Sequence, residues 1–495
     1  MNLNLLLLIP LLTAIAILFC KGLKQVRSVS LAGALVQLVL SLLLFADYLK
    51  ERSQGNTAAM LFEFKRSWFT ALNVNYHIGV DGISIAMILL TAFVVLAGIL
   101  VSWTMDTLSQ EFFFLLTLLS LGAYGFFISL DLFTLFFFLE VSVIPKFLLI
   151  GIWGSGDKAK SSMKLALMLM GGSALLFVGL VGLYFNTAVD GGSYTFDLME
   201  IAARNIPPDA QKIFFPFAFL GFGIFTAIFP FHTWVPDGHA SAPTAASMFL
   251  AGISMKLGGY GCLRVATFLM PEGAAAWSWV IIALATIAII YGAFATMMQT
   301  DLKYINAYSS VSHCGFVLLG IGMLTQTSIT GAVLQMVSHG LMTALFFAVI
   351  GMIYSRTHTR QVAQLGGLLK VMPFISSVFV IAGLCSLGLP GLSGFVAEMT
   401  VFMGSWQNPD PWYRLATILA CASIVVTAVY ILRATGQTIM GPINAAHQQL
   451  GDAGWNEKLA AVVLVSAILV IGLVPFWLNE LVQPGTALII SKFIR

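Results

Sequence analysis

Charged residues are scarce in this chain of 495 residues. Lys, Arg, Asp and Glu together make up only 9% of it, whereas 59% is hydrophobic. A soluble domain carries about 25% charged residues, and no soluble globule could cover this much apolar surface. The formal net charge of +3 is also too small to indicate nucleic-acid binding. The composition therefore predicts a polytopic membrane protein.

Cysteine is scarce as well, and the few cysteines form no pattern. The five are scattered, without a CxxC pair or a CxxCH sequence: Cys20, Cys262, Cys314, Cys385 and Cys421. This argues against an iron–sulfur cluster, a covalent haem or a disulfide framework. No GxGxxG opens a helix within a strand–helix unit, and there is no P-loop. We therefore predict that the chain itself holds no cofactor and no metal, and that its energy comes from an ion gradient or from a partner.

Long apolar runs are abundant, and a run of about 20 residues can cross a bilayer. The stretch 1–18 has no basic region before it and no cleavage site after it, so we interpret it as a first membrane helix rather than a signal peptide. The predicted fold class is an all-α polytopic membrane protein with about fourteen transmembrane helices. The predicted spans lie near 2–20, 28–48, 79–103, 111–130, 132–152, 164–186, 212–234, 241–268, 275–298, 303–324, 329–355, 371–404, 412–438 and 457–482. The polar segment 49–78 and the mixed segment 187–211 are predicted loops, the second with a short helix.

Two of these spans are interrupted. Pro230 and Pro236 break the seventh, and the run Gly388–Gly394 breaks the twelfth. Lipid cannot satisfy the backbone groups that such breaks free, so each break must be buried in protein or line a wet cavity. The breaks lie five helices apart, which predicts two inverted five-helix repeats with ion sites at their midplane. The predicted domains are 1–110 (helices one to three), 111–268 (first repeat), 269–438 (second, inverted repeat) and 439–495 (helix fourteen).

Orientation follows from the basic loops. Loops 21–27, 158–164 and 356–370 carry most of the clustered lysines and arginines and fall on one face, which we assign to the cytoplasm. The opposing segment 49–78 also holds basic residues, which weakens the contrast between the two faces. With fourteen spans, both termini are then expected on the opposite, periplasmic side of a bacterial inner membrane.

Ionisable residues inside the spans form the candidate site. A charge at the bilayer centre costs about 2.5–3.5 kcal/mol on insertion scales, so each one calls for a reason. Burial raises the pKa of glutamate and lowers that of lysine, so that both can exchange protons near neutral pH, and histidine titrates in this range without such a shift. The residues predicted to form a proton relay are Glu140, Lys146, Lys256, His313, His339 and Glu398.

Each member has a plainer alternative. The glutamates and Lys256 could be static ion-pair partners, the histidines could be satisfied core residues, and Lys146 could help to pack its helix against a polar cavity. Asp301 and Lys303, at the mouth of the tenth span, are interpreted as a solvated loop pair. Asp81 is interpreted as a charge at a helix N-terminus. The joint pattern favours the relay because acids and bases stand singly on several helices beside two helix breaks.

At these residues the sequence resembles a known family. The segments that carry the resemblance are FPFHTWVPDGHASAPTAASMFLAGISMKLGGYG (229–261), DLKYINAYSSVSHCGFVLLGI (301–321), SHGLMTALFFAVIGMIYSRTHTR (338–360) and GLPGLSGFVAEMTVF (388–402). They are similar to the proton-pumping, antiporter-like subunits of respiratory complex I, most closely to subunit M (chain 4). The resemblance implies one proton channel, driven by quinone reduction elsewhere in the complex. It also implies that Glu140, Lys256, His313, His339 and Glu398 take the relay positions.

One position departs from the family pattern. The family usually has a lysine in helix seven, five residues before the proline of FPFH, and here that position is Phe225. Lys146, where the family usually has an apolar residue, is an additional base, and we predict that it replaces the lost lysine. Residues i and i+6 of a straight helix lie about 240° apart, so Lys146 and Glu140 would not face each other unless Pro145 kinks the helix.

The resemblance implies a non-redox, proton-translocating membrane subunit of an NADH–quinone oxidoreductase. FMN, iron–sulfur clusters and quinone would then reside in partner subunits, and the partners would be the other membrane subunits and the lipid bilayer. Two alternatives share the core segments: a subunit of a multi-subunit cation/proton antiporter, and a subunit of a related membrane-bound hydrogenase or dehydrogenase. Co-purification with flavin and iron–sulfur subunits would distinguish them.

Overall fold

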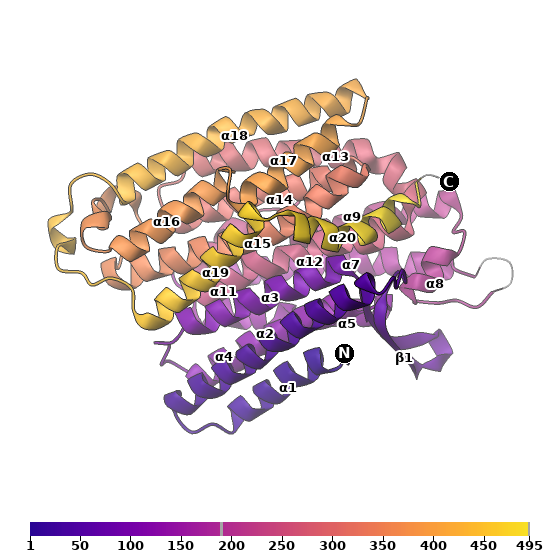
Figure 1. The fold of residues 1–495 in the computed structure, drawn as a ribbon, viewed down its shortest axis with the longest axis horizontal. Coiled ribbons are helices and arrows are strands. Elements are labelled where there is room, and N and C mark those ends of the chain that lie inside the picture. Colours follow the sequence, from indigo (N-terminus) through magenta and orange to yellow (C-terminus); the bar gives the residue numbers. More distant parts are fainter. Residues whose placement is uncertain (189–191, 494–495) are drawn as a thin grey trace.

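Long helices run along one common direction in the computed structural model, which describes residues 1–188 and 192–493 (Figure 1). Among those residues, nine helical stretches are long and apolar enough to cross a membrane, which confirms an integral membrane protein. They are α2 (Leu23–Ser53), α3 (Gly82–Val101), α4 (Ser109–Ile128), α5 with α6 (Leu132–Val141 and Val143–Trp153), α7 (Lys158–Phe185), α13 (Pro271–Met297), α15 (Gln326–Thr357), α18 (Pro411–Thr438) and α19 (Trp455–Leu473).

Shorter or less apolar helices complete the bundle. These are α1 (Leu5–Leu18), α8 (Leu198–Ala203), α9 (Pro208–Thr226), α10 (Trp234–Ser241), α11 (Thr244–Phe249), α12 (Met255–Gly261), α14 (Leu302–Gly322), α16 (Pro373–Ser386), α17 (Ser393–Trp406) and α20 (Phe476–Ile490). Single 3₁₀ turns connect some of them: η5 (Val362–Gln364), η6 (Leu368–Lys370) and η7 (Ala445–His447). A further 3₁₀ turn, η1 (Thr70–Leu72), lies in the segment between α2 and α3. The predicted short helix in 187–211 is α8.

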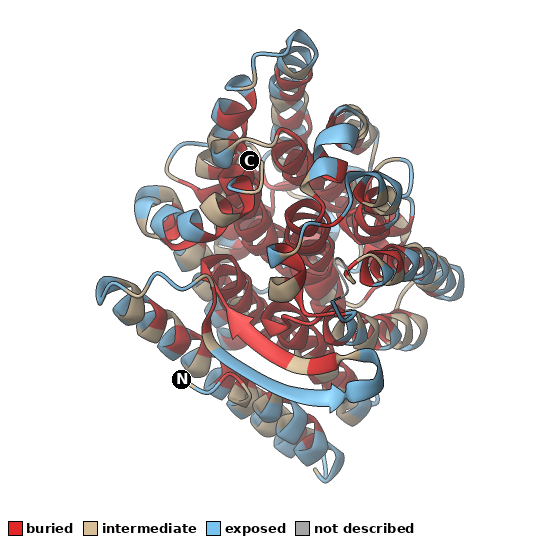
Figure 2. Cartoon of the chain, turned by 90° about the vertical axis from the view of Figure 1, so that its right-hand side faces the viewer, coloured by how far each residue is buried: buried red, intermediate tan, exposed pale blue. Residues whose placement is uncertain are grey.

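Burial separates central from peripheral helices. The most apolar window of α15 is 100% buried and that of α3 is 94% buried, whereas the corresponding window of α2 is only 28% buried. Figure 2 shows the buried residues gathered in the middle of the bundle. A helix that is apolar all round belongs in such a centre, and the peripheral helices turn apolar side chains outward, as a lipid environment requires.

A two-stranded antiparallel hairpin lies at one end of the bundle. It occupies much of the segment 49–78, for which the sequence predicted a polar loop. It pairs β1 (Leu61–Phe69) with β2 (Val74–Val80). Strand β2 is mostly buried, and β1 is exposed along most of its length (Figure 2). The all-α expectation is therefore wrong for this segment, because β2 is pinned to the bundle by a bridge between Ile78 and Ser129. We call this side of the molecule the hairpin end.

The three predicted basic loops meet at the opposite end. Arg27 lies over the ring of Trp103, which packs edge-on against Trp455. Arg356 pairs with Glu457 two residues further along. The loop before α7 joins the same end, because the amide of Ser155 bonds to the carbonyl of Ser241, next to the contact between Arg360 and Ala240. We call this side the basic end.

The predicted break of the seventh span separates α9 from α10. Helix α9 stops at Thr226, and Ala227 adopts a left-handed conformation with φ of 70°. Protein groups take up the freed backbone: the indole of Trp234 donates to the carbonyl of Ile224 at 2.9 Å, and the amide of Ile228 bonds to Gly223. The backbone at the start of the break is thus satisfied within the protein, whereas Pro230, Phe231 and Thr233, further along the break, are exposed.

The predicted break of the twelfth span separates α16 from α17. Gly388 and Gly391 there have φ values of 75° and 93°, a region that side chains disfavour. A Cβ atom on Gly388 would also lie only 2.6 Å from Oε2 of Glu398. The glycine therefore leaves room for that carboxylate, which places an acidic group directly beside the break.

The eighth span is continuous but irregular. It runs from α11 through a π-helical segment η3 (Leu250–Ser254), α12, and a second π-helical segment η4 (Cys262–Thr267). Such π-helical turns occur frequently at functional sites. As expected from the sequence, small residues bring a neighbour close, since a Cβ on Gly258 would meet the carbonyl of Phe222 in α9 at 2.5 Å. Lys256 lies in α12, between the two π-helical segments.

Candidate functional site

Lys256 is buried at the centre of the bundle with 1% of its surface exposed. Its ammonium nitrogen Nζ donates to the carbonyl of Ala251 at 2.6 Å and lies 2.7 Å from Nδ1 of His339 in α15. Ala251 lies in the π-helical segment η3, one turn before Lys256, and its carbonyl lies on the same face of the helix as the lysine. The lysine therefore faces a histidine ring nitrogen, an arrangement across which a proton can pass directly.

The chain of ionisable groups continues from His339 towards the second broken helix. The rings of His339 and His313 stack with centroids 5.3 Å apart. Nδ1 of His313 lies 3.3 Å from Oε1 of Glu398 in α17, and its Nε2 lies 3.1 Å from the hydroxyl of Ser386, the last residue of α16. Four predicted residues from four helices thus form one connected series: Lys256, His339, His313 and Glu398.

Glu140 and Lys146 form a second cluster, on the other side of α9. Glu140 accepts a hydrogen bond from the hydroxyl of Ser173 in α7. Lys146 is 1% exposed, and its Nζ donates to the hydroxyl of Ser142 at 3.0 Å. The same Nζ lies 5.7 Å from the ring centroid of Phe225 in α9, so Lys146 extends to the side chain of Phe225.

A break in the fifth span explains this orientation. The span divides at Ser142 into α5 and α6, three residues before Pro145, whose ring cannot accommodate the carbonyl of residue 141 in a regular helix. Lys146 consequently does not lie on the opposite side of the span from Glu140, as it would on a straight helix, and it interacts electrostatically with Glu140. The span is thus interrupted just before Pro145, and Lys146 is buried within the protein rather than pointing into lipid or into a loop.

The two clusters are not joined directly. No hydrogen bond or ion pair between the described residues links Glu140 or Lys146 to Lys256. The end of α9 lies between them: Phe225 faces Lys146, and the next residue, Thr226, packs against Gly258 two residues beyond Lys256. The structure therefore brings four of the six predicted residues into one series and pairs the other two beside it.

Two further buried bases were missed by the sequence analysis. Lys303 is not part of a solvated loop pair, because it is 5% exposed and its Nζ donates to the carbonyl of Ala242 at 2.6 Å, while Asp301 pairs with Arg360. His239 is fully buried, and neither of its ring nitrogens has a hydrogen-bond partner. Both lie between the basic end and Lys256. In the sequence, His239 follows the break of the seventh span, whereas Lys303 lies at the mouth of the tenth span.

A buried ion pair was also missed. Asp81 caps α3 by accepting from the amide of Ser84 at 2.9 Å, as predicted, but it also pairs with Arg264 in η4. Both side chains are 1% exposed. The hydroxyl of Ser84 in turn lies 2.9 Å from that of Tyr260, one turn beyond Lys256. Arg264 lies in the same predicted span as Lys256, 241–268, so its charge within an apolar run was a signal that could have indicated it.

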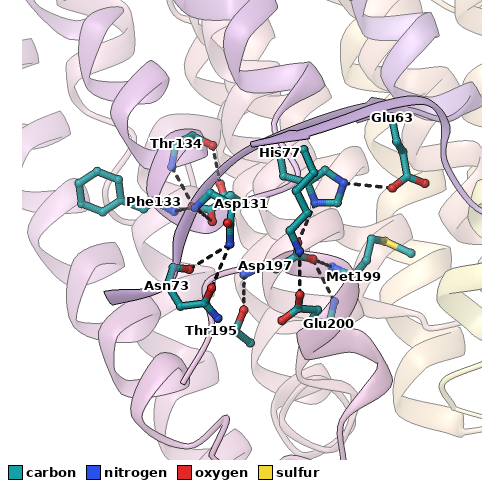
Figure 3. A network of polar contacts seen from close by, with 12 residues as sticks. Glu63, Asn73, His77, Asp131, Phe133, Thr134, Thr195, Asp197, Met199 and Glu200 are labelled. Atoms are coloured by element: carbon teal, nitrogen blue, oxygen red, sulfur yellow. Dashed lines mark hydrogen bonds and ion pairs between the residues drawn. The ribbon is translucent and has the colours of Figure 1, made fainter. Parts of the chain in front are cut away.

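A network of charged side chains joins the hairpin to the bundle (Figure 3). His77 of β2 lies between two carboxylates, with Nδ1 2.7 Å from Asp197 and Nε2 3.0 Å from Glu63. Lys65 of β1 pairs with Asp197 and with Glu200, each at 2.7 Å. Asp197 also caps α8. These contacts couple the strands to the segment before α8.

The network shifts the pKa values of its members in opposite directions. Burial by itself lowers the pKa of His77, but the carboxylates of Asp197 and Glu63 outweigh it and raise the pKa above its usual range. Burial would raise the pKa of Asp197, but His77 and Lys65 outweigh it and lower that pKa to about 2. Both shifts favour the charged pair.

This pairing predicts a pH window for hairpin stability. The ionised Asp197 stabilises the fold fully above its unfolded pKa of about 3.9, and this stabilisation is lost as the pH falls towards 2. The protonated His77 stabilises the fold fully below its unfolded pKa of about 6.5, and this stabilisation is lost as the pH rises through the raised pKa of the folded state. Hydrogen exchange of residues 61–80, corrected for intrinsic rates, should therefore show most protection between about pH 4 and 6.5. His77→Gln should lose the alkaline limb; identical alkaline profiles in both proteins would contradict the assignment.

Metal ligands do not cluster. Within residues 1–188 and 192–493, no group of three His, Cys, Asp or Glu side chains could hold a metal ion. The side chains of the two clusters carry amines, imidazoles, carboxylates and hydroxyls, which are groups able to donate or accept protons.

The bundle with two broken helices and a buried series of bases and acids defines an antiporter-like membrane subunit. The chain belongs to the family described as NADH:quinone oxidoreductase/Mrp antiporter, whose transmembrane region matches residues 129–425. This confirms the resemblance found in the sequence.

Individual relatives cover nearly the whole chain. It is 34% identical over 490 residues to NAD(P)H-quinone oxidoreductase chain 4 of Gloeobacter violaceus, covering 98% of this chain and 91% of that protein. It is also 34% identical over 472 residues to NADH-quinone oxidoreductase subunit M of Rickettsia prowazekii, covering 94% of each.

Solved structures have the same fold. A chain of respiratory complex I from Thermus thermophilus superposes with a TM-score of 0.88 at 26% identity, over 98% of this chain and 99% of that one. A chain of the Mrp complex from Dietzia sp. superposes with a TM-score of 0.86 at 19% identity, over 99% of this chain and 97% of that one. The second likeness concerns the fold alone.

Proposed function

We propose that this chain is a proton-translocating membrane subunit of an NADH–quinone oxidoreductase. It performs no redox step itself: FMN, iron–sulfur clusters and quinone belong to partner subunits, and this chain moves protons when they react. The observation that carries the proposal is the series from Lys256 through His339 and His313 to Glu398, which crosses four helices at the level of the second helix break. Each neighbouring pair is close enough to exchange a proton directly or through one water molecule.

In this proposal Lys146 replaces the helix-seven lysine of the family. Its ammonium group lies over Phe225, and Glu140 supplies the opposite charge. Because the partner of a buried base sets how readily that base takes up a proton, moving α9 relative to α5 and α6 would change the protonation of Lys146. The end of α9 also packs against α12, so the same motion would reach Lys256.

Protons would be taken up at the basic end and released near Glu398. Lys303 and His239 lie on the uptake side, where the unpartnered nitrogens of His239 can hold bridging water. The basic end would face the cytoplasm, and both termini and the hairpin would face the periplasm of a bacterial inner membrane. The partners would be other membrane subunits, including neighbouring antiporter-like subunits.

We also propose fourteen crossings in two inverted repeats, within 111–268 and 269–438, followed by a C-terminal unit at 439–495. Counting α5 with α6, α9 with α10, α11 with α12, α16 with α17, and α19 with α20 as single crossings supports this number. The two broken helices then occupy equivalent places in the two repeats.

Glu398→Gln in the assembled enzyme tests the proposal. The substitution keeps the shape of the side chain but removes its ability to take up and release a proton. NADH-driven acidification of inverted membrane vesicles should fall by at least about tenfold, because a positioned proton-transfer group contributes roughly 10²–10⁴-fold to a rate. Electron transfer from NADH to an artificial acceptor that reacts before quinone should be unchanged.

Glu480→Gln is the matched control, because Glu480 is an exposed acid on α20, away from the series. It should pump as the unmodified chain does. Normal pumping by the Glu398 variant would remove the series from the mechanism. Purification of the chain without flavin and iron–sulfur subunits would instead favour an antiporter subunit.

A further inference from the structure

A glutamine lies beside the last step of the series from Lys256 to Glu398. Gln335 is in α15, one turn before His339, and it is 2% exposed. Its amide nitrogen Nε2 lies 3.3 Å from Nδ1 of His313 in α14. The same Nδ1 lies 3.3 Å from Oε1 of Glu398 in α17. Two side chains from two different helices therefore meet one ring nitrogen.

That ring nitrogen can serve only one of the two partners fully. A histidine nitrogen carries either a proton or a single lone pair, and a glutamine amide nitrogen only donates. The contact with Nε2 of Gln335 therefore requires that Nδ1 of His313 carries no proton. A neutral His313 then holds its proton on Nε2, which can donate to the hydroxyl of Ser386, 3.1 Å away. In this arrangement Nδ1 has no proton to give to Glu398.

The amide of Gln335 is free to turn over. Among the described residues its oxygen Oε1 has no hydrogen-bond partner, although it is buried, so no second contact fixes the orientation of the group. The torsion that carries a glutamine amide is broad and roughly two-fold. Turned by 180°, the amide would direct Oε1 at Nδ1, and a carbonyl oxygen accepts only from a protonated nitrogen. Each orientation thus matches one protonation state of Nδ1.

We propose that Gln335 is a positioning residue that controls the proton on Nδ1 of His313, an inference that rests on the proposed proton relay. With the amide N–H directed at Nδ1, the nitrogen stays bare and is separated from the exchange with Glu398. With Oε1 directed at Nδ1, the amide stabilises the N–H that faces Glu398. When the proton passes, the N–H bond of the imidazolium breaks and an O–H bond forms on the carboxylate. His313 is left neutral with its other proton on Nε2, and Gln335 turns back.

Two substitutions at Gln335 test this role. Gln335→Met keeps the length of the side chain but removes donor and acceptor, so Glu398 becomes the sole polar partner of Nδ1 and should hold a proton there. Gln335→Glu, when ionised, can only accept and should hold the proton on Nδ1 more firmly. Both variants should lower NADH-driven acidification of inverted vesicles, relative to NADH oxidation, by about two- to tenfold, the factor by which one hydrogen bond shifts an equilibrium.

Gln37→Met is the matched control. Gln37 is a buried glutamine of α2, 4% exposed, and its Oε1 likewise has no hydrogen-bond partner among the described residues. Its amide nitrogen donates to the carbonyl of Leu6 in α1, away from both ionisable clusters. The Gln37 variant should pump as the unmodified chain does. Normal pumping by both Gln335 variants would overturn the inference.

The protonation of the His313 ring is a readout that a merely structural role of Gln335 would not change. This chain is synthesised with ¹⁵N-histidine, and the assembled complex is studied in bilayers without NADH by solid-state NMR. Subtracting the spectrum of His313→Gln isolates the His313 signals. The unmodified chain should show a bare Nδ1 and a protonated Nε2, and both Gln335 variants should show a protonated Nδ1. Identical ring signals in all three would overturn the inference even if Glu398→Gln confirms the relay, whereas normal pumping by Glu398→Gln would reject the proposed function and, with it, the role of Gln335 in pumping.

Discussion

Lys146→Met should strongly reduce NADH-driven proton pumping by the assembled enzyme, and adding Phe225→Lys to that variant should restore a large part of it. The reason is geometric. Nζ of Lys146 lies 5.7 Å from the ring centroid of Phe225, so a lysine at 225 can place its ammonium group near the vacated position. Methionine preserves the apolar stem of the lysine but removes the charge that pairs with Glu140. Pumping should fall by about tenfold or more, as expected for a proton-transfer group, measured as acidification of inverted vesicles.

Three further variants define this experiment. Lys256→Met should give a similar loss, but Phe225→Lys should not rescue it, because Lys256 lies on the other side of α9. Lys160→Met is the matched control, since Lys160 is exposed at the start of α7, and it should pump normally. Unchanged pumping by Lys146→Met would remove that residue from the relay. Loss of pumping without rescue by Phe225→Lys would leave Lys146 in the relay but reject the positional replacement.

The membrane character and the two helix breaks could be predicted because each depends on local chemistry. Apolar runs of sufficient length require a bilayer whatever their neighbours are. Pro230 lies in the turn between α9 and α10, and Gly388 and Gly391 lie in the turn between α16 and α17, where their backbone properties disfavour a helix. Pro236, which was also predicted to break the seventh span, is instead accommodated in the first turn of α10. The proximity of Glu398 to the second break could likewise be predicted, because only a few residues of the sequence separate them.

The direction of Lys146 could be predicted only conditionally. On a straight helix it faces away from Glu140, and the sequence could state that a kink at Pro145 would change this. The size and direction of the kink depend on how α5 and α6 pack on α7 and α9. The contact between Lys146 and Phe225 could therefore be seen only in the structure, although the absence of a lysine at position 225 indicated this region.

Other features had no local signal. Lys303 follows a helix cap and looks like a surface residue, and only the fold of the segment around Ala242 over it shows that it is buried. The hairpin depends on pairing between strands and on the bridge from Ile78 to Ser129, a contact between distant parts of the chain. Long-range contacts of this kind decide what a polar segment becomes, and its composition does not.

The buried pair of Asp81 and Arg264 leads to the largest expected effect on stability. Arg264→Met should destabilise the protein by about 3–5 kcal/mol, because it leaves the carboxylate of Asp81 buried without an opposite charge. The double variant Asp81→Asn/Arg264→Met should be far milder, since neither buried charge remains. The asparagine oxygen can still accept from the amide of Ser84, so the cap of α3 is kept.

Thermal unfolding of the purified complex, followed by the loss of this chain from it, measures the difference. The double variant should unfold close to the unmodified protein and the single variant several degrees lower. The matched control is Lys164→Met, which breaks the ion pair with Asp237; there both side chains are 34% exposed, so the cost should stay within about 0–1 kcal/mol. Equal melting of the single and double variants would show that Asp81 gains another partner or water when Arg264 is removed. The single variant therefore reports whether this end of the eighth span is dry, because only an anhydrous site makes an unpaired carboxylate so costly.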